Sequence, residues 1–414
     1  LSSRDDSINR DGVSLTLDSS GEGLYGQWFG INVGGSVLDG KVLPEAEFSR
    51  QWDGPWTGNA VPTDYGYSAE MFLPWSMMSM PDAGESRRMG FYMSRKVAYL
   101  NERWGWPALP RTAPKFMSAL QPIELRGINP RQQFTYYPFA STTYDVLDDD
   151  PDYRAGLDVF WRPSSNLQFA ATLLPDFGTV ESDDVVVNLT SFETFFPEKR
   201  LFFLEGSEIF ETSPRSNVLA RLSSSSSSSG GRRTASDFTP TPTTLLNTRR
   251  IGGPADAPNL PDGLEIAGVD LGKPTDLLGA VKLTGQLGGL RFGMLSAFED
   301  DPEFVATDAA GNRYAVVPDG RDFGAFRLLY ETVDGSRKSI GWMSTAVLNN
   351  KGDAYVYGVD GHYLSESGEW KVDTQLISSD VSGAQGYGGF SDVVYVPKRG
   401  HRHQLTLDYL DEEL

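Results

Sequence analysis

The chain has 414 residues, with 36 lysines and arginines against 56 aspartates and glutamates, and a net charge of -20. A field of this sign repels phosphate backbones, so nucleic acid is not expected as a partner. The absence of cysteine excludes disulfides, thiolate metal sites and a cysteine nucleophile. No run of about 18 apolar residues occurs, which excludes a transmembrane helix but not a β-barrel, because barrel strands alternate.

The composition favours β structure, since 44 glycines, 23 phenylalanines, 17 tyrosines and 9 tryptophans indicate many short strands and turns. Val13, Leu15 and Leu17 alternate with polar residues at 11–18, which is the period of a half-buried strand. Further strands are predicted at 23–35, 65–74 and 88–97. Residues 1–130 therefore predict part of a β-sandwich. The chain starts at Leu1 without an apolar leader, so we expect a removed signal peptide or a start inside a longer protein.

An acidic stretch, DVLDDDPD at 145–152, follows this block, and residues 131–152 are predicted to form a linker. A hairpin is predicted next, with strands at 153–161 and 167–174 joined by RPSSN. Strands then repeat from residue 277 onward. They are predicted at 277–285, 290–298, 322–331, 338–348, 353–364, 369–379, 391–396 and 402–410.

The two faces of these strands differ in chemistry. In 353–364 the tyrosines and Val359 share one face, whereas Asp360 and His362 share the other. Tyrosine and tryptophan near strand ends suit an aromatic girdle, and lengths of about 9 to 11 residues match a tilted membrane strand. The pattern predicts an all-β chain with an antiparallel transmembrane β-barrel over 153–414, incomplete at its C-terminus. A soluble β-sandwich or propeller is the alternative.

The densest aromatic run, FFPEKRLFFLEG at 195–206, lies between the hairpin and the later strands. Pro197 interrupts any regular ladder, so residues 175–210 are predicted to form a bent plug inside the barrel. Its charges are expected to pair with one another, since unpaired charges away from water are costly; contact with a substrate or ion in the lumen is the other interpretation. The predicted plug and lumen residues are Phe195, Phe196, Glu198, Lys199, Arg200, Phe202, Phe203 and Glu205. Residues 211–246, rich in Ser, Gly, Pro and Thr, are predicted to form a flexible loop.

Two tryptophans are candidates for sugar binding. Trp52 and Trp56 lie among Gly, Pro and Asp, where an exposed indole can stack on a sugar ring. Core packing is the alternative role. Glu193, Glu198 and Glu205 are candidates for the two catalytic carboxylates of a glycosidase, but the number of carboxylates is no evidence of the required geometry.

Metal binding has weak support in the sequence. His401 and His403 point the same way on one strand, without an evident third ligand. The acidic clusters at 148–152 and 181–184 lack the spacing of a calcium loop. We therefore predict no cofactor, with calcium as the alternative.

The segment DVFWRPSSNLQFAATLLPDFGTVESDDVVVNLTSFETFFPEKRLFFLEGSEIF resembles the hallmark region of a bacterial outer-membrane family. That family joins an N-terminal module, similar to family-9 carbohydrate-binding (DOMON-like) modules, to a C-terminal β-barrel domain of unknown function. NTRRIGG at 247–253 resembles the family's next barrel strand, and GYSAEMFLPW resembles the final strands of the module. The chain departs from the family pattern at Leu201, where proline is typical.

The resemblance implies a location in the outer membrane of a Gram-negative cell, with membrane lipid as a partner and the module on the periplasmic side. The implied function is transport or surface anchoring of glycan-related material. The alternatives are a carbohydrate-active hydrolase and a scaffold for a periplasmic or surface partner protein. Family members are often labelled hydrolases, but no residue set in this chain supports catalysis, so no catalytic residue is predicted.

Overall fold

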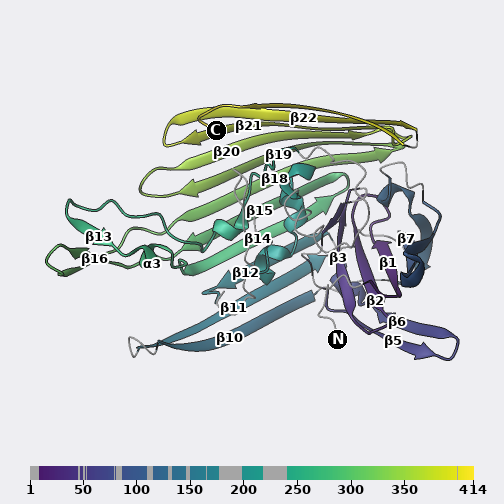
Figure 1. The fold of residues 1–414 in the computed structure, drawn as a ribbon, viewed down its shortest axis with the longest axis horizontal. Coiled ribbons are helices and arrows are strands. Elements are labelled where there is room, and N and C mark those ends of the chain that lie inside the picture. The colour runs from purple at the N-terminus through teal and green to yellow at the C-terminus, as the bar shows by residue number, and fades with distance from the viewer. Residues whose placement is uncertain are drawn as a thin grey trace.

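The protein is almost entirely β in this computed structural model. The structure describes residues 9–44, 47–49, 52, 54–78, 80, 86–109, 115–128, 133–145, 150–164, 166–176, 198–217, 240–398 and 400–414. These residues form an N-terminal domain and a large antiparallel sheet with short helical segments against it (Figure 1). None of the helices in these ranges is long and apolar enough to cross a membrane.

The N-terminal domain contains a seven-stranded sheet with the strand order β4-β3-β2-β1-β7-β8, and β9 also pairs with β7. Its strands are β1 (Gly12–Asp18), β2 (Gly26–Asn32), β3 (Val37–Leu43), β4 (Glu47–Ser49), β7 (Ser86–Val97), β8 (Glu102–Trp106) and β9 (Gln121–Arg126). A separate hairpin comprises β5 (Thr57–Thr63) and β6 (Gly66–Phe72), and three single turns are η1 (Trp75–Met77), η2 (Ala98–Leu100) and η3 (Met117–Ala119). The predicted strands in this region are confirmed. The described residues give one large sheet and a hairpin, so the expected sandwich is only partial here.

The second sheet has eleven strands in the order β10-β11-β12-β14-β15-β18-β19-β20-β21-β22-β23. They are β10 (Gln133–Asp145), β11 (Asp150–Ser164), β12 (Leu167–Leu173), β14 (Leu277–Leu287), β15 (Leu290–Glu299), β18 (Asp322–Asp334), β19 (Ser336–Leu348), β20 (Ala354–Leu364), β21 (Trp370–Val381), β22 (Ala384–Lys398) and β23 (His401–Leu410). The predicted hairpin and all eight later strands are confirmed. Within the described ranges the sheet is open, with β10 and β23 at its edges.

The linker predicted at 131–152 is wrong for the residues that the structure describes. β10 pairs with β11 along its whole length, from Gln133 opposite Arg162 to Asp145 opposite Asp150. Asp145, Asp150 and Asp152 therefore lie on paired strands, and the aromatic residues between Phe134 and Tyr144 lie on a strand of the large sheet.

The two ends of the large sheet carry different connections. At one end the turns are tight: Leu287 pairs with Leu290, and Asp334 pairs with Ser336. The opposite end carries the long connections 174–276 and 300–321, and also one tight turn between β21 and β22, where Val381 pairs with Ala384. A three-stranded sheet of β13 (Leu264–Ile266), β16 (Phe304–Asp308) and β17 (Arg313–Val316) lies there with α3 (Gly268–Leu271). The N-terminal domain lies beside the tight-turn end, and β13 and β16 project from the other (Figure 1).

One face of the large sheet is covered by two stretches of chain, 198–217 and 240–253, and we call 198–217 the inner segment. The inner segment contains α1 (Leu201–Leu204), η4 (Ser207–Phe210) and η5 (Pro214–Asn217), and η6 (Thr248–Arg250) follows in the second stretch. Buried residues of both stretches form one core with small and apolar side chains of the sheet. The members of this core are Phe202, Phe203, Ile209, Phe210, Ile251, Ala170, Leu277, Ala280, Leu295, Ala297, Ala325, Leu329 and Met343.

The flexible loop predicted at 211–246 is wrong at both of its ends. Residues 211–217 and 240–246 have defined positions, and Arg215 is among the largest fully buried side chains of the protein. The packing of Phe202 and Phe203 against the sheet agrees with the predicted plug. Phe195 and Phe196, and Glu193, lie outside the described residues.

Candidate functional site: the charged inner face and the inner segment

The strand alternation places most charged residues of the large sheet on the face beneath the inner segment. Neighbouring strands bring these positions into register, for example Asp360 opposite Gln375, and His362 opposite Asp373. Gly341 lies beside Arg327, and a Cβ atom there would stand only 2.5 Å from the guanidinium. The glycine therefore makes room for the buried arginine to reach across β19 to Asp360 on β20.

A buried ionic cluster occupies the centre of this face. Arg327 donates two hydrogen bonds to Asp360, one of them 2.8 Å long, and both side chains are almost inaccessible to solvent. His362 lies between two carboxylates, with Nε2 3.1 Å from Asp360 and Nδ1 2.8 Å from Asp373. Lys371 Nζ is 3.2 Å from the other oxygen of Asp373. An imidazolium ring satisfies all of these contacts, because both nitrogens then donate.

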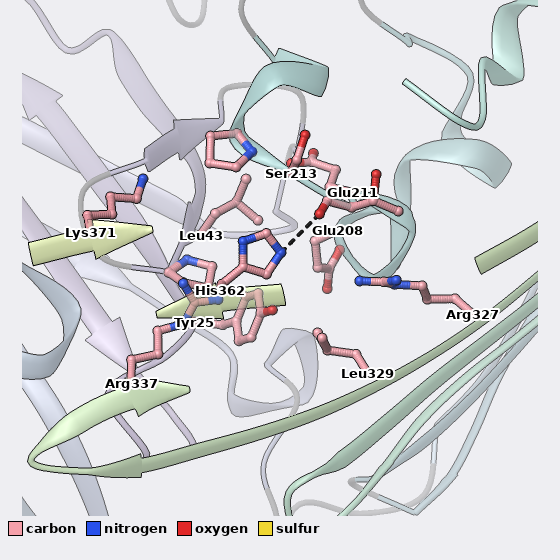
Figure 2. A pocket seen from close by; sticks show the side chains of 13 residues that line it. Tyr25, Leu43, Glu208, Glu211, Ser213, Arg327, Leu329, Arg337, His362 and Lys371 are labelled. Carbon is pink, nitrogen blue, oxygen red and sulfur yellow. Dashed lines mark hydrogen bonds between the residues drawn. The ribbon is translucent and has the colours of Figure 1, made fainter. Parts of the chain in front are cut away.

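The cluster also holds the inner segment. His362 Nε2 lies 3.0 Å from the carbonyl oxygen of Thr212, the contact dashed in Figure 2. Gln375 Nε2 donates to the hydroxyl of the same threonine at 2.8 Å. Thr212 is buried, so these bonds fix the backbone position of the segment against β20 and β21.

Arg215 makes the most extensive ionic contact between the inner segment and the sheet. Its Nε and Nη2 donate to the two oxygens of Asp392 at 2.7 and 2.8 Å, and Nη1 donates to Asp408. Its guanidinium carbon lies 3.8 Å from the centre of the Phe390 ring. A bidentate pair with a cation–π contact is a strong and directional arrangement. It attaches η5 to the last two strands.

A small cavity of about 50 Å³ lies where the N-terminal domain, the inner segment and the sheet meet. Figure 2 shows Tyr25 reaching it from the N-terminal domain, with Glu208 on the inner segment and Arg327 and His362 on the sheet. The Tyr25 ring lies under the guanidinium of Arg291, 3.6 Å from its carbon. Burial and the nearby charge of Glu331 raise the pKa of Tyr25 to about 12, so this phenol stays neutral.

The N-terminal domain also contacts the inner segment through one ion pair. Lys41 Nζ lies 2.6 Å from Glu208 Oε2. Burial opposes the ionisation of Glu208, but the charges of Lys41 and Arg291 outweigh burial and hold the pKa of Glu208 below its usual value. The contact is therefore a true ion pair at neutral pH.

The charged residues of the predicted plug differ in their burial and in their ion-pair partners. Arg200 Nε and Nη2 donate to the two oxygens of Glu198 at 2.8 and 2.7 Å, and the same arginine donates to the carbonyls of Thr248 and Ile251. Burial opposes ionisation of Glu198, but these bonds outweigh burial and lower its pKa. The expected internal pairing is thus present for Glu198 and Arg200. Lys199 is only half-buried.

Glu205 pairs with Arg162 on β11 instead of with a residue of its own cluster. Lys282 on β14 donates to the carbonyl oxygens of Phe202 and Phe203, and so caps the last turn of α1. Glu198, Glu205 and Glu208 of the inner segment therefore each have their own cationic partner. A pore or substrate role for these residues stays a prediction.

The two candidate sugar-binding tryptophans lie in the core of the N-terminal domain. Trp52 and Trp56 are 6% and 4% exposed, and both contact the Phe29 ring edge-on, with centroids 6.1 and 5.4 Å away. Trp56 Nε1 donates to Asp39 at 2.9 Å. Core packing thus accounts for Trp56, whereas Trp52 also borders a cavity. Sugar binding by either tryptophan stays a prediction.

The candidate metal ligands do not come together in the part of the chain that is described. His401 and His403 lie on the exposed edge strand, and no cluster of three or more His, Asp or Glu residues suited to a metal ion occurs there. The side chains of the acidic clusters at 148–152 and 181–184 lie outside the described residues.

Sequence reasoning did not identify Lys282, Arg327 or Arg215 as members of the site. The sequence alone could have indicated Lys282 and Arg327, because a cation at an inward position of a barrel strand needs a partner in the interior. Arg215 carried none, since its neighbours Ser213, Pro214 and Ser216 have the composition of a loop.

The model of a family described as a domain of unknown function (DUF5916) matches residues 130–214, and no curated protein matches the chain. The match agrees with the resemblance to a family that carries such a domain. It does not reach the N-terminal domain, whose likeness to a carbohydrate-binding module stays a prediction.

Two solved structures resemble the chain at low scores. One is Wzi of Escherichia coli, an outer membrane protein involved in group 1 capsule assembly and described as a carbohydrate-binding β-barrel. It shares 11% identity, with 97% of this chain and 80% of that chain covered and a TM-score of 0.28. The other is OccK7 (OpdD) of Pseudomonas aeruginosa, with 9% identity, 97% and 94% coverage and a TM-score of 0.19. Likenesses of this strength carry no argument about function.

Proposed function

We propose that the protein is an outer-membrane β-barrel protein whose wall includes the eleven-stranded sheet, and that it transports or anchors glycan-related material at the cell surface. The observation that carries the proposal is the contrast between the two faces of the sheet. Large apolar side chains are exposed along the face away from the inner segment, such as Leu376 at 66%, Ile340 at 60% and Leu407 at 60%. An apolar face of this extent favours lipid as its surroundings.

Aromatic residues on the same face support this placement. Tyr363, Trp370 and Tyr395 lie near the tight-turn end, and Trp370 stacks on Tyr395 with ring centroids 4.2 Å apart. Tyr357 and Tyr387 lie towards the other end, and aliphatic residues lie between. Two aromatic bands that flank an aliphatic zone suit the two interfaces of a bilayer.

The connections support an orientation. Outer-membrane barrels have short turns on the periplasmic side and longer loops outside. The tight turns at 288–289 and at 335 would then be periplasmic, as would the N-terminal domain beside them. The β13-β16-β17 sheet would face the exterior.

The inner segment covers the inner face of the sheet through apolar packing and buried ion pairs. If the wall closes around this face, transport along it would require that the inner segment move away from the sheet. Anchoring requires no such movement, and both roles place the N-terminal domain next to the membrane.

The test is membrane association of the whole chain and of two matched variants. Leu376→Arg puts a charge in the middle of β21, where it should cost about 2–4 kcal/mol in a bilayer. The control is Val61→Arg, which also replaces an exposed aliphatic residue with arginine but lies on the β5–β6 hairpin of the N-terminal domain. We expect the parent and the control to resist extraction without detergent and to show heat-dependent gel mobility, and Leu376→Arg to lose both. A parent chain that is freely soluble without detergent would overturn the proposal.

A further inference from the structure

We propose that a second cavity, between the N-terminal domain, the first hairpin of the large sheet and the inner segment, binds a neutral sugar ring. The cavity measures about 280 Å³, just below the range of roughly 300–1,000 Å³ that is usual for small-molecule sites. Each of the three parts contributes to its lining. The residues that carry the argument are Trp52, Gln133, Tyr137, Phe160, Arg162 and Glu205.

Aromatic rings supply the apolar part of the site. Tyr137 is 51% exposed on β10, and Phe160 on β11 contacts its ring edge-on at 6.1 Å. Trp52 is held from behind by Phe29. Each of these three rings contacts another ring, which limits its movement before a ligand arrives and reduces the entropy cost of binding. The C–H face of a sugar ring can pack on such aromatic surfaces.

The polar part of the site is electrically balanced. Arg162 and Glu205 form an ion pair whose side chains are 22% and 19% exposed, so the pair is partly open to the cavity. Gln133 lies directly across from Arg162 in the β10–β11 register. A guanidinium, a carboxylate and an amide together offer donors and acceptors in fixed planes, which suits adjacent hydroxyl groups.

These features exclude other simple ligand classes on physical grounds. A purely apolar ligand would remove water from the ion pair without replacing its hydrogen bonds, which is costly. An anionic ligand would face the carboxylate of Glu205 in a protein whose net charge is -20. A neutral ring with many hydroxyls satisfies both the aromatic and the polar walls.

The inference rests on the proposed role in glycan handling and gives that role a site. Of the two tryptophans predicted as candidates for sugar binding, Trp52 borders this cavity and Trp56 does not. A bound sugar would touch both the N-terminal domain and the inner segment, so it would bridge the two.

The experiment is calorimetric titration of the detergent-purified chain with glucose, galactose, cellobiose, lactose and glucuronate. We expect saturable binding of at least one neutral sugar and weaker binding of glucuronate than of glucose. Tyr137→Ala removes the exposed ring and should weaken binding roughly tenfold, as should Arg162→Lys, which keeps the charge but loses the planar fork. Tyr153→Ala, at a 76% exposed position of β11 away from the cavity, is the matched control and should bind as the parent does.

Absence of saturable binding by every neutral sugar, or binding that both cavity variants leave unchanged, would overturn the inference. Tighter binding of glucuronate than of glucose would overturn the charge argument and the ligand class with it. The outcome is separate from that of the membrane test, because Tyr137→Ala leaves the lipid-facing residues intact. A chain that inserts into the membrane but binds no sugar would overturn the proposed sugar site and leave the proposed membrane location unaffected.

Discussion

Replacing Arg215 with methionine should release the end of the inner segment from the sheet. The methionine keeps much of the side-chain volume, but it leaves the carboxylates of Asp392 and Asp408 facing each other without their cation. Removing one partner of a buried ion pair costs about 3–5 kcal/mol. Asp408 is 36% exposed and can be rehydrated, so we expect the lower value, about 3 kcal/mol. At 1.4 kcal/mol per factor of ten, the released population should rise roughly 100-fold.

The absence of cysteine gives a direct assay for this release. Ser216→Cys introduces a single thiol beside Arg215, and its maleimide labelling rate in the folded protein reports how often the segment opens. Every variant compared carries Ser216→Cys, so the loss of the Ser216 hydrogen bond to Ser213 is the same in all of them and does not affect the comparison. Arg215→Met should label roughly 100-fold faster, and Arg313→Met, at an exposed position of β17, should not.

Adding Asp392→Asn to Arg215→Met should recover part of the protection, because it removes one of the two uncompensated charges. The reasoning fails if Arg215→Met labels within about threefold of the background rate while its circular dichroism stays native. It also fails if Arg313→Met accelerates labelling equally.

Two further predictions concern the ion pairs near α1 and η4. Arg200→Ala should lower the thermal midpoint well below that of Lys199→Ala, because Arg200 holds Glu198 and two backbone carbonyls and lies 4.2 Å from the Phe203 ring centre. Equal midpoints for the two variants would contradict this. The depressed pKa of Glu208 adds stability above its unfolded pKa of about 4.3, and that stability is lost as the pH falls through the lower folded value. Glu208→Gln should therefore flatten the acid limb of a stability–pH curve, and an unchanged limb would exclude the Lys41 pair as its cause.

Much of the large sheet could be predicted because strand alternation is a local signal. Tyr357 and Val359 on one side of β20, with Asp360 and His362 on adjacent inward positions, already separate the two faces. β10 was not predicted, because the acidic run at 145–152 dominates the local composition and the aromatic residues before it fall on both faces of the strand, with Phe134 and Tyr136 on one and Tyr137 and Phe139 on the other. A strand with aromatic residues on both faces lacks the period of two that identifies a strand in sequence.

The contacts of the inner segment could not be predicted, because they depend on residues far away in the sequence. Arg215 meets Asp392 and Asp408, which lie 177 and 193 residues later. Nothing near Arg215 indicates burial, and only the sheet register brings both aspartates to one place. The pairing of Glu198 with Arg200 was predictable because both residues lie in one short bend.

The inner segment combines two kinds of contact that respond differently to water. Its phenylalanines and Ile209 contribute apolar burial, which is not directional and tolerates small shifts. The pairs made by Arg215 and Glu208 are directional, and a buried ion pair contributes little net stability compared with an apolar pair of similar size. These ion pairs therefore determine where the segment lies on the sheet, but they add little to the free energy that keeps it bound. Water that reached one pair would weaken it by raising the local dielectric. Because both pairs lie on one short stretch of chain, loss of one should promote loss of the other, so opening should be concerted and not gradual.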